Sequence, residues 1–332
     1  MLHALSRFGR RRTLQGGAVA AVVLGLLLWW VLPLGEPEPS GSLTFSTGVR
    51  SGVYQLYGQR LEGSLAKDMP KVSIELQTSE GSQQNIERVA MGQADFTIAT
   101  ADAVTTYLQS GKPGGARLRG CVRLYDDYVQ LIVPRGSKIQ KVADLRGKRV
   151  GVGQKGSGVR LVADRLMTAA GVDPAEDITP VSAGIDTMPA RLMDDRLDAF
   201  FWSGGLPTGA VQELSERFAI RLVPLEDPLI TELQAAGGST RHYRSAVMPA
   251  DAYLNAQQGQ AVQTVAVANL LITTDRTDPL MTEAFTRTVI DSRDRIGREV
   301  HAAQLVDLRT AIYTDPLPLH EGAKRYYRSA KP

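Results

Sequence analysis

Residues 149–170 read RVGVGQKGSGVRLVADRLMTAA, and this stretch decides the fold class. Its first part, 149–153, is a short apolar run that predicts a strand, and 154–158 is a loop with two glycines and a serine. Apolar residues at helical spacing follow at 159–170. A strand that passes through a glycine loop into a helix is the repeating unit of α/β proteins.

The same unit recurs on both sides of this stretch. Strands are predicted at 43–47, 72–76, 94–99, 128–134, 149–153, 197–203, 221–225 and 265–273. Most of them run through a Gly, Ser or Thr loop into a helix, so we expect parallel sheets covered by helices on both faces. The stretch 226–262 is less regular, and two helices are predicted near the C-terminus, at 279–292 and 295–311.

Composition limits the class of protein. The chain has 332 residues, 43% hydrophobic and 22% charged, which is typical of a folded protein with room for two domains. Residues 1–41 hold four Arg and two Glu and so carry +2 of the formal net charge of +3. The nearly neutral remainder predicts no nucleic-acid partner. The lone cysteine, Cys121, excludes an intramolecular disulfide and a cysteine-based zinc site, and we expect it to be buried.

The N-terminal segment has the pattern of a signal anchor. No charge occurs from Thr13 to Gly35, 23 residues that as a helix would span roughly 34 Å, enough for a bilayer core. Arginines precede this run, which predicts a cytoplasmic N-terminus and an exported body. We therefore predict a transmembrane anchor at 1–34, a linker at 35–41 and a body at the extracytoplasmic face of the bacterial cell membrane. The alternative is a cleaved signal that leaves the body periplasmic or secreted.

Four loops carry the candidate binding chemistry, at Thr47–Gly52, Thr78–Ser82, Gly153–Gly158 and Ser203–Thr208. Each follows a predicted strand and opens a helix, where free backbone N–H groups and the helix dipole attract an anion. Any one of them is equally well read as a tight turn. Four in one chain favour a ligand cleft at the carboxyl ends of the strands.

The candidate ligand-binding residues lie in and beside these loops. They are Thr47, Gly48, Arg50, Ser51, Gly52, Tyr54, Ser79, Gly81, Ser82, Asn85, Thr100, Asp102, Gly156, Ser157, Gly158, Arg160, Trp202, Ser203, Gly204 and Gly205. Asp102 is a candidate for binding a ligand ammonium group, or else a plain helix cap. Tyr54 and Trp202 either wall the ligand or only pack. Arg50 and Arg160 form a second anionic subsite if they turn inward, and are surface charge if they do not.

Catalytic and cofactor motifs are absent from the sequence. Gly151–Gly156 spells G-x-G-x-x-G, but the apolar strand that a dinucleotide site needs before the first glycine is too short. His320 has no second histidine four positions after it, which excludes an H-E-x-x-H zinc pair. The adjacent acids Asp126–Asp127 and Asp194–Asp195 are typical of solvated positions. We therefore expect a binding protein without metal or cofactor rather than an enzyme.

Several motifs together resemble the TAXI family of TRAP-transporter solute receptors. They are Thr47–Tyr54, Ser79–Asn85, Gly92–Phe96, Asp144–Gly153 with Gly156–Gly158, Leu197–Phe201 with Gly205 and Pro207, and Pro318–Tyr327. The chain departs from the family pattern at Arg50, Ser51 and Arg160, which leaves the exact ligand open.

The resemblance implies an α/β, two-lobed periplasmic-binding-protein fold of the second type with a ligand cleft between the lobes. Lobe one is expected at 42–134 plus 266–332 and lobe two at 135–265. The strands that cross between the lobes would be 128–134 and 265–273, with 221–226 as the alternative second crossing.

The resemblance also implies a function. Members of the family capture small organic acids or amino acids outside the membrane and deliver them to a TRAP permease driven by an ion gradient. We expect a solute-binding protein for a small carboxylate, either an amino acid such as glutamate or a dicarboxylate. The alternatives are a sensor that presents its ligand to a signalling partner and, less favoured, an exported enzyme on the same fold.

Overall fold

The computed structural model describes residues 22–23 and 38–330. The described residues from Pro39 onward form one compact unit, separate from the segment that precedes them. The predicted anchor at 1–34, apart from the helical Val22 and Val23, and the first part of the linker lie outside the described residues. Within 22–23 and 38–330, no helix is both long and apolar enough to cross a membrane.

Ten strands join into one sheet with the order β2-β1-β3-β10-β4-β7-β5-β6, and β8 and β9 pair with β4 and β10 respectively. The strands are β1 (Gly41–Ser46), β2 (Val72–Gln77), β3 (Phe96–Thr100), β4 (Leu118–Pro134), β5 (Arg149–Gly151), β6 (Thr179–Val181), β7 (Ala199–Gly204), β8 (Ile220–Val223), β9 (Arg244–Met248) and β10 (Val262–Thr274).

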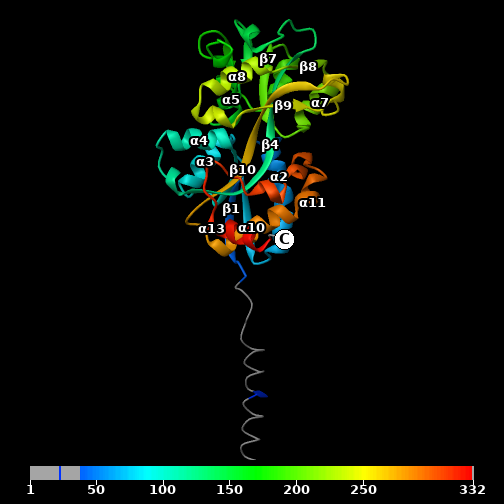
Figure 1. The fold of residues 1–332 in the computed structure, drawn as a ribbon. Coiled ribbons are helices and arrows are strands. Elements are labelled where there is room, and N and C mark those ends of the chain that lie inside the picture. Colours follow the sequence, from blue (N-terminus) through cyan, green and yellow to red (C-terminus); the bar gives the residue numbers. More distant parts are fainter. Residues whose placement is uncertain (1–21, 24–37, 331–332) are drawn as a thin grey trace, which may run out of the picture. The chain divides into compact units, whose positions relative to one another are not determined.

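Helices connect most of these strands (Figure 1). The longer helices are α2 (Val53–Asp68), α3 (Ser82–Ala90), α4 (Ala101–Gln109), α5 (Gly158–Ala169), α6 (Met188–Met193), α7 (Gly209–Arg217), α8 (Asp227–Ala235), α10 (Pro279–Asp291) and α13 (Glu321–Ser329). The shorter helical segments are η1 (Gly115–Arg117), η2 (Val142–Leu145), η3 (Gly238–His242), α9 (Leu254–Gln257), α11 (Arg293–Gly297), η4 (His301–Leu305) and α12 (Leu308–Ala311).

The body has separate hydrophobic cores at its two ends. One end holds β1–β3, α2–α4 and α10–α13, with Phe45, Phe96 and Phe285 in contact at its centre, and we call it lobe one. The other end holds β5–β9 and α5–α9 around buried residues such as Phe200 and Leu166, and we call it lobe two. The long strands β4 and β10 run through both ends (Figure 1). The lobe boundaries expected from the sequence stay a prediction.

The expectation of parallel sheets is correct at the edges and wrong in the centre. β1 is parallel to β2 and β3, and β5 is parallel to β6 and β7. However, β10 runs antiparallel to β3 and β4, and β4 runs antiparallel to β7 and β8. The reason is that β4 leads the chain from lobe one into lobe two and β10 leads it back, so the two strands have opposite directions.

Several segments differ from the predicted elements, and β6 has no counterpart among the predicted strands. β4 begins ten residues earlier than predicted, because charged side chains interrupt the apolar run at 118–127. The irregular stretch 226–262 contains α8, η3, β9 and α9. The predicted helix at 295–311 is three short segments, and the side chain of Asp307 caps a new helix start by accepting from Arg309 N at 2.9 Å. Helix α13 was not predicted.

Candidate functional site

A cavity lies where the two lobes meet. The volume open to the centre of a water molecule in it is about 50 Å³, which leaves room for a compact solute. Its lining residues are Gly48, Val49, Gly52, Val53, Tyr54, Glu80, Gly81, Ser82, Thr100, Asp127, Gly153, Gln154, Ser157, Gly158, Val159, Ala183, Gly184, Ile185, Met188, Trp202, Ser203 and Gly204. The loops that follow β1, β2, β5 and β6 and the ends of β3 and β7 therefore meet in one place, as is typical of ligand sites in α/β sheets.

Four helices begin at this cavity. Gly52, Gly81, Thr100 and Ser157 are the N-cap residues of α2, α3, α4 and α5, and all four line it. The first three make no side-chain cap hydrogen bond. The first N–H groups of a helix have no acceptor within that helix, so the cavity receives donors and the positive ends of helix dipoles from both lobes.

About half of the predicted ligand-binding residues line the cavity. They are Gly48, Gly52, Tyr54, Gly81, Ser82, Thr100, Ser157, Gly158, Trp202, Ser203 and Gly204. All four predicted loops contribute, and glycine is required at Gly81, whose φ is 125° and where a Cβ would lie 3.4 Å from Ser157 Cα of the other lobe.

Three predicted residues lie behind the cavity wall and hold the loops in place. Ser79 Oγ donates to Thr47 O at 3.1 Å and accepts from Gly81 N at 3.0 Å. Asn85 Nδ2 donates to Thr47 O at 2.6 Å and to Ile98 O at 2.9 Å. Thr47, Ser79 and Asn85 are buried and do not line the cavity, so the structure gives them a supporting position.

The predicted arginines do not reach the cavity. Arg50 is exposed, and Arg160 forms an ion pair of 2.7 Å with Asp164 one helical turn further along α5. A second anionic subsite would require these two arginines to turn inward, and neither of them lines the cavity in this structure. Arg160 is partly exposed and paired along its own helix, as surface charge is.

Three further predicted residues lie beside the cavity. Ser51 is exposed, and its backbone N donates to Asp186 Oδ1 of lobe two at 3.1 Å. The carbonyl of Gly156 accepts from Gln84 N at 3.1 Å, which is also a bond between the lobes. Gly205 is buried, and a Cβ there would lie 2.6 Å from Ala302 Cβ. Ser51 and Gly156 therefore join the lobes, and Gly205 is packed.

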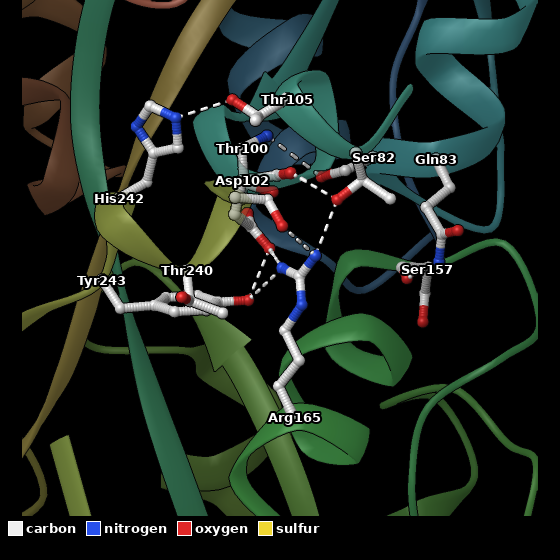
Figure 2. Close-up of polar contacts among 12 residues, drawn as sticks. Ser82, Gln83, Thr100, Asp102, Thr105, Ser157, Arg165, Thr240, His242 and Tyr243 are labelled. Carbon is white, nitrogen blue, oxygen red and sulfur yellow. Dashed lines mark hydrogen bonds and ion pairs between the residues drawn. The ribbon is translucent and has the colours of Figure 1, made fainter. Parts of the chain in front are cut away.

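Asp102 is neither an N-cap nor a cavity residue. The N-cap of α4 is Thr100, and Asp102 is 1% exposed. Its Oδ2 lies 2.9 Å from Arg165 Nη1 of α5 and accepts from Tyr243 Oη at 2.6 Å (Figure 2). The carboxylate of Asp102 is therefore paired with the guanidinium of Arg165, which reaches it from lobe two across the junction between the lobes.

Arg165 bonds to several partners at this junction (Figure 2). Its Nη2 donates to Thr106 Oγ1 of lobe one at 2.7 Å and to Ser239 Oγ at 2.6 Å. We call Arg165 with Asp102, Thr106, Ser239 and Tyr243 the Arg165 network. This network brings α5 of lobe two against α4 of lobe one.

Two more hydrogen bonds join the lobes near the network. Gln83 Nε2 donates to Ser157 O at 2.7 Å, at the rim of the cavity (Figure 2). His242 Nε2 lies 2.6 Å from Thr105 Oγ1, and burial lowers the pKa of this histidine. The lobes are therefore closed over the cavity in this structure.

Asp127 of β4 is a cavity residue that the sequence analysis missed. It was expected to be solvated together with Asp126, but Asp127 is only 3% exposed and lines the cavity. Its Oδ1 accepts from Asn269 Nδ2 at 2.6 Å. The pKa of Asp127 is raised to about 7, chiefly by burial; the hydrogen bond from Asn269 lowers it, and the nearby Asp126 also raises it. Asp126 instead forms ion pairs with Arg123, at 2.7 Å, and with Arg244.

A chain of hydrogen bonds links Asp127 to the wall of lobe one. Tyr54 Oη donates to Asn269 Oδ1 and lies 3.1 Å from Ser82 Oγ. Burial and the nearby Asp127 raise the pKa of Tyr54 well above its ordinary value, so this phenol stays protonated. Ser82 Oγ accepts from Thr100 N at 3.2 Å. The polar side of the cavity is thus positioned by α2, α3, β4 and β10.

Two buried polar atoms on the cavity wall have no hydrogen-bond partner. They are Glu80 Oε2 and Thr100 Oγ1. Buried polar atoms in folded proteins are nearly always bonded, so these two, on residues that line the cavity, are candidates for contact with a bound molecule. Among the described residues, no group of three His, Cys, Asp or Glu is arranged to hold a metal ion.

The fold places the chain in a class. Among solved structures it resembles a putative L-cystine ABC transporter protein of Listeria monocytogenes, with a TM-score of 0.50, 13% identity and 80% and 98% of the two chains covered. It also resembles an ancestral arginine-binding protein bound to arginine, with a TM-score of 0.50, 14% identity and coverage of 78% and 98%. The fold is therefore the α/β fold of periplasmic binding proteins.

The family is narrower than this class. Residues 45–330 match the model of the NMT1-like family, and the chain belongs to that family. A further structure, the alkanesulfonate-binding protein of Xanthomonas axonopodis pv. citri bound to MOPS, is 18% identical over 90% and 86% of the two chains, with a TM-score of 0.48. The more specific resemblance to TAXI receptors, the second-type topology and the anchor stay predictions.

Proposed function

We propose that this protein is an extracytoplasmic solute-binding protein that captures a small carboxylate-bearing solute, such as an amino acid, in the cavity between its lobes. One observation carries the proposal: the N-cap residues of four helices, drawn from both lobes, converge on one cavity. A carboxylate there would accept from free N–H groups and oppose the helix dipoles, with about 0.3–1 kcal/mol from each favourable terminus and more when it is buried.

The same cavity supports a binding role rather than catalysis. Its glycine-rich wall brings backbone donors close to a ligand, and its lining residues include no histidine or cysteine. Of its serines, Ser82 accepts from Thr100 N and Ser157 donates to Gln154 O. The closed lobes would have to open to load a solute, as hinge-type binding proteins do. Two crossing strands, β4 and β10, are suited to such a hinge.

The partner we propose is a membrane permease of the TRAP type, driven by an ion gradient. Support comes from the resemblance to TAXI receptors. The alternative is an ATP-driven importer, because the Listeria protein of similar fold is described as part of an ABC transporter. Reconstitution of the chain with a candidate permease in vesicles would separate these. Uptake into vesicles without ATP, dependent on an imposed ion gradient, is the expected result, and uptake that requires ATP would contradict it.

The proposed location is the extracytoplasmic face of the bacterial cell membrane, through the anchor predicted at 1–34. The periplasmic alternative requires cleavage of this segment. Fractionation of cells followed by N-terminal sequencing tests the tether. An intact N-terminus in the membrane fraction is expected, and a shortened chain in the soluble periplasmic fraction would contradict the anchor.

Equilibrium binding tests the capture of a carboxylate. The full-length protein would be titrated by calorimetry with amino acids, dicarboxylates, 2-oxo acids and sugars. We expect at least one carboxylate to bind and the sugars not to bind. Binding of a sugar and of none of the acids would overturn the proposal.

A further inference from the structure

We propose that the cavity contains a subsite for a protonated amine, formed by Asp127 and Glu80, and that this subsite selects amino acids over dicarboxylates and 2-oxo acids. The inference rests on the proposed function and goes beyond it, because it names the second group that the solute must carry.

The charges on the cavity wall point to a cationic group. Among the lining residues, the ionisable acids are Glu80 and Asp127, and no lysine, arginine or histidine lines the cavity. The basic residues adjacent to the lining loops lie outside the cavity: Arg50 and Lys155 are exposed, and Arg160 is paired with Asp164. The wall therefore holds two carboxyl groups without a basic side chain of the protein to neutralise them.

Asp127 is held in place for contact with a ligand. Its Oδ1 is bonded to Asn269 Nδ2 at 2.6 Å, and Asn269 is in turn fixed by Tyr54 Oη. Asp127 is 3% exposed and lines the cavity, so a molecule bound there would contact it. An isolated carboxylate at such a position is costly unless it is paired with a cation.

Two unpartnered atoms are independent signs of a ligand. Glu80 Oε2 is buried without a hydrogen-bond partner. The backbone of this residue is held in place, because Glu80 N donates to Gln84 Oε1 at 2.8 Å. Thr100 is 3% exposed, lines the cavity and has an unbonded Oγ1. An ammonium group has three donors and no acceptor, so it suits a wall that offers carboxylate and hydroxyl oxygens.

Selectivity follows from the charges on the wall. An α-amino acid would place its carboxylate at the helix N-termini and its ammonium at the acids. A dicarboxylate or a 2-oxo acid has no ammonium, and its second acidic or carbonyl oxygen would meet Asp127 or Glu80. Like charges placed together and acceptors facing acceptors reject such a ligand, which is how binding sites discriminate against close analogues.

The subsite links binding to pH. Asn269 of β10 donates to Asp127, and the acids Asp126 of β4 and Asp102 of α4 place negative charge near it. Tyr54 of α2 and Tyr125 of β4 are close enough for Asp127 to raise the pKa of each. With a pKa of about 7 in the empty cavity, Asp127 is protonated at low pH and cannot pair with an ammonium group. Affinity for an amine-bearing solute should therefore rise as pH increases from 6 to 8.

The test is a titration of the full-length protein with matched probes. The panel contains the twenty amino acids, the α-hydroxy and 2-oxo acids with the same carbon skeletons, and the amines that lack the carboxylate. We expect an amino acid to bind at least about tenfold more tightly than its hydroxy and oxo counterparts, since a hydrogen bond to a charged group contributes at least that much. Asp127→Asn should reduce this preference toward one, and Glu80→Gln should weaken it.

Asp126→Asn is the matched control, because Asp126 adjoins Asp127 on β4 but is paired with Arg123 and Arg244 and does not line the cavity. It should retain the preference, and circular dichroism verifies that each variant is folded. Equal binding of hydroxy acids and amino acids, or a preference that survives in Asp127→Asn, would overturn the amine subsite while carboxylate capture stands. Binding of free amines alone would support the subsite and overturn carboxylate capture. A panel in which nothing binds would overturn both.

Discussion

Arg165 Nη1 lies 2.9 Å from Asp102 Oδ2, and this ion pair joins α5 of lobe two to α4 of lobe one. The carboxylate side chain is 2% exposed and the guanidinium side chain 17% exposed, so the pair is largely removed from water. A buried pair adds little net stability, but removal of one partner leaves an uncompensated charge. Because its partners belong to different lobes, the pair connects the two lobes in this closed structure.

Arg165→Met should therefore weaken closure. We expect the free energy of unfolding to fall by about 3 kcal/mol, because Asp102 loses its counter-charge in a buried site. The closed state should also be less populated, so small-angle scattering should give a larger radius of gyration. Arg160→Met, on the same helix and paired with the partly exposed Asp164, is the control and should cost less than about 1 kcal/mol. Equal effects of the two variants on stability and size would contradict a role of Arg165 in closure.

Asp127→Asn should stabilise the unliganded protein at high pH. The folded pKa of about 7 lies above the unfolded value of about 4, so Asp127 adds no penalty below about pH 4, where both states are protonated. Between pH 4 and 7 Asp127 is ionised in the unfolded chain but still protonated in the folded protein, so the free energy of unfolding of the wild type falls as pH rises. Above about pH 7 Asp127 is ionised in both states and this loss of stability is complete. Urea denaturation should show the free energy of unfolding of the variant gaining on that of the wild type by about 2.5 kcal/mol between pH 5 and pH 8, out of about 4 kcal/mol for the full shift. A gap that shrinks over this range would refute the raised pKa.

Gly158→Ala should weaken solute binding. An added Cβ would lie 3.1 Å from Ser82 Oγ and 3.5 Å from Thr100 Oγ1, both on lobe one, so the methyl group enters the space between the lobes. Overpacking of this kind costs about 1–3 kcal/mol, which is a loss of about tenfold or more in affinity by calorimetry. Gly63→Ala is the control, because a Cβ at this position in α2 meets nothing within 4 Å. Unchanged affinity in Gly158→Ala would mean that closure does not involve this contact.

Removal of residues 1–38 should leave a folded body that binds the same solute with the same affinity. The residues from Pro39 onward form one compact unit, and β1 begins at Gly41, which pairs with Val72. The cut therefore spares the first strand, unlike a cut after the predicted linker at 35–41. Thermal unfolding and calorimetry of the shortened and full-length proteins would be compared. Aggregation or loss of binding in the shortened chain would show that the N-terminal segment belongs to the fold.

The sequence predicts the repeated units well, because each unit is encoded locally. The loops at Thr47–Gly52 and Gly153–Gly158 combine an apolar run, glycines and a helical pattern, and these local signals also placed Gly81, Ser82 and Ser157 in the candidate site. Glycine-rich helix starts at strand ends converge in any α/β sheet. The convergence of the loops was therefore predictable before any contact was known.

The charged residues of the site were not predictable in the same way. Asp126 and Asp127 are adjacent, and neighbouring residues of a strand point to opposite faces, so one meets Arg244 and the other meets the cavity. From the sequence, Asp102 is a candidate either for a ligand ammonium group or for a helix cap, because it lies where a helix begins after a strand end. Its actual partner, Arg165, is 63 positions away in the sequence and belongs to the other lobe. Only the tertiary arrangement decides which acid is paired within the protein and which is left open.

The most direct test of solute capture is native mass spectrometry of the full-length protein after incubation with the panel of amino acids, hydroxy acids and amines. The account predicts one amino acid bound per chain in the wild type, and none in Gly158→Trp, whose indole would fill the space between Ser82 and Thr100. Circular dichroism of the variant verifies its fold. A wild type that retains no member of the panel, or a variant that retains the same amino acid to the same extent, would contradict capture in the cavity between the lobes.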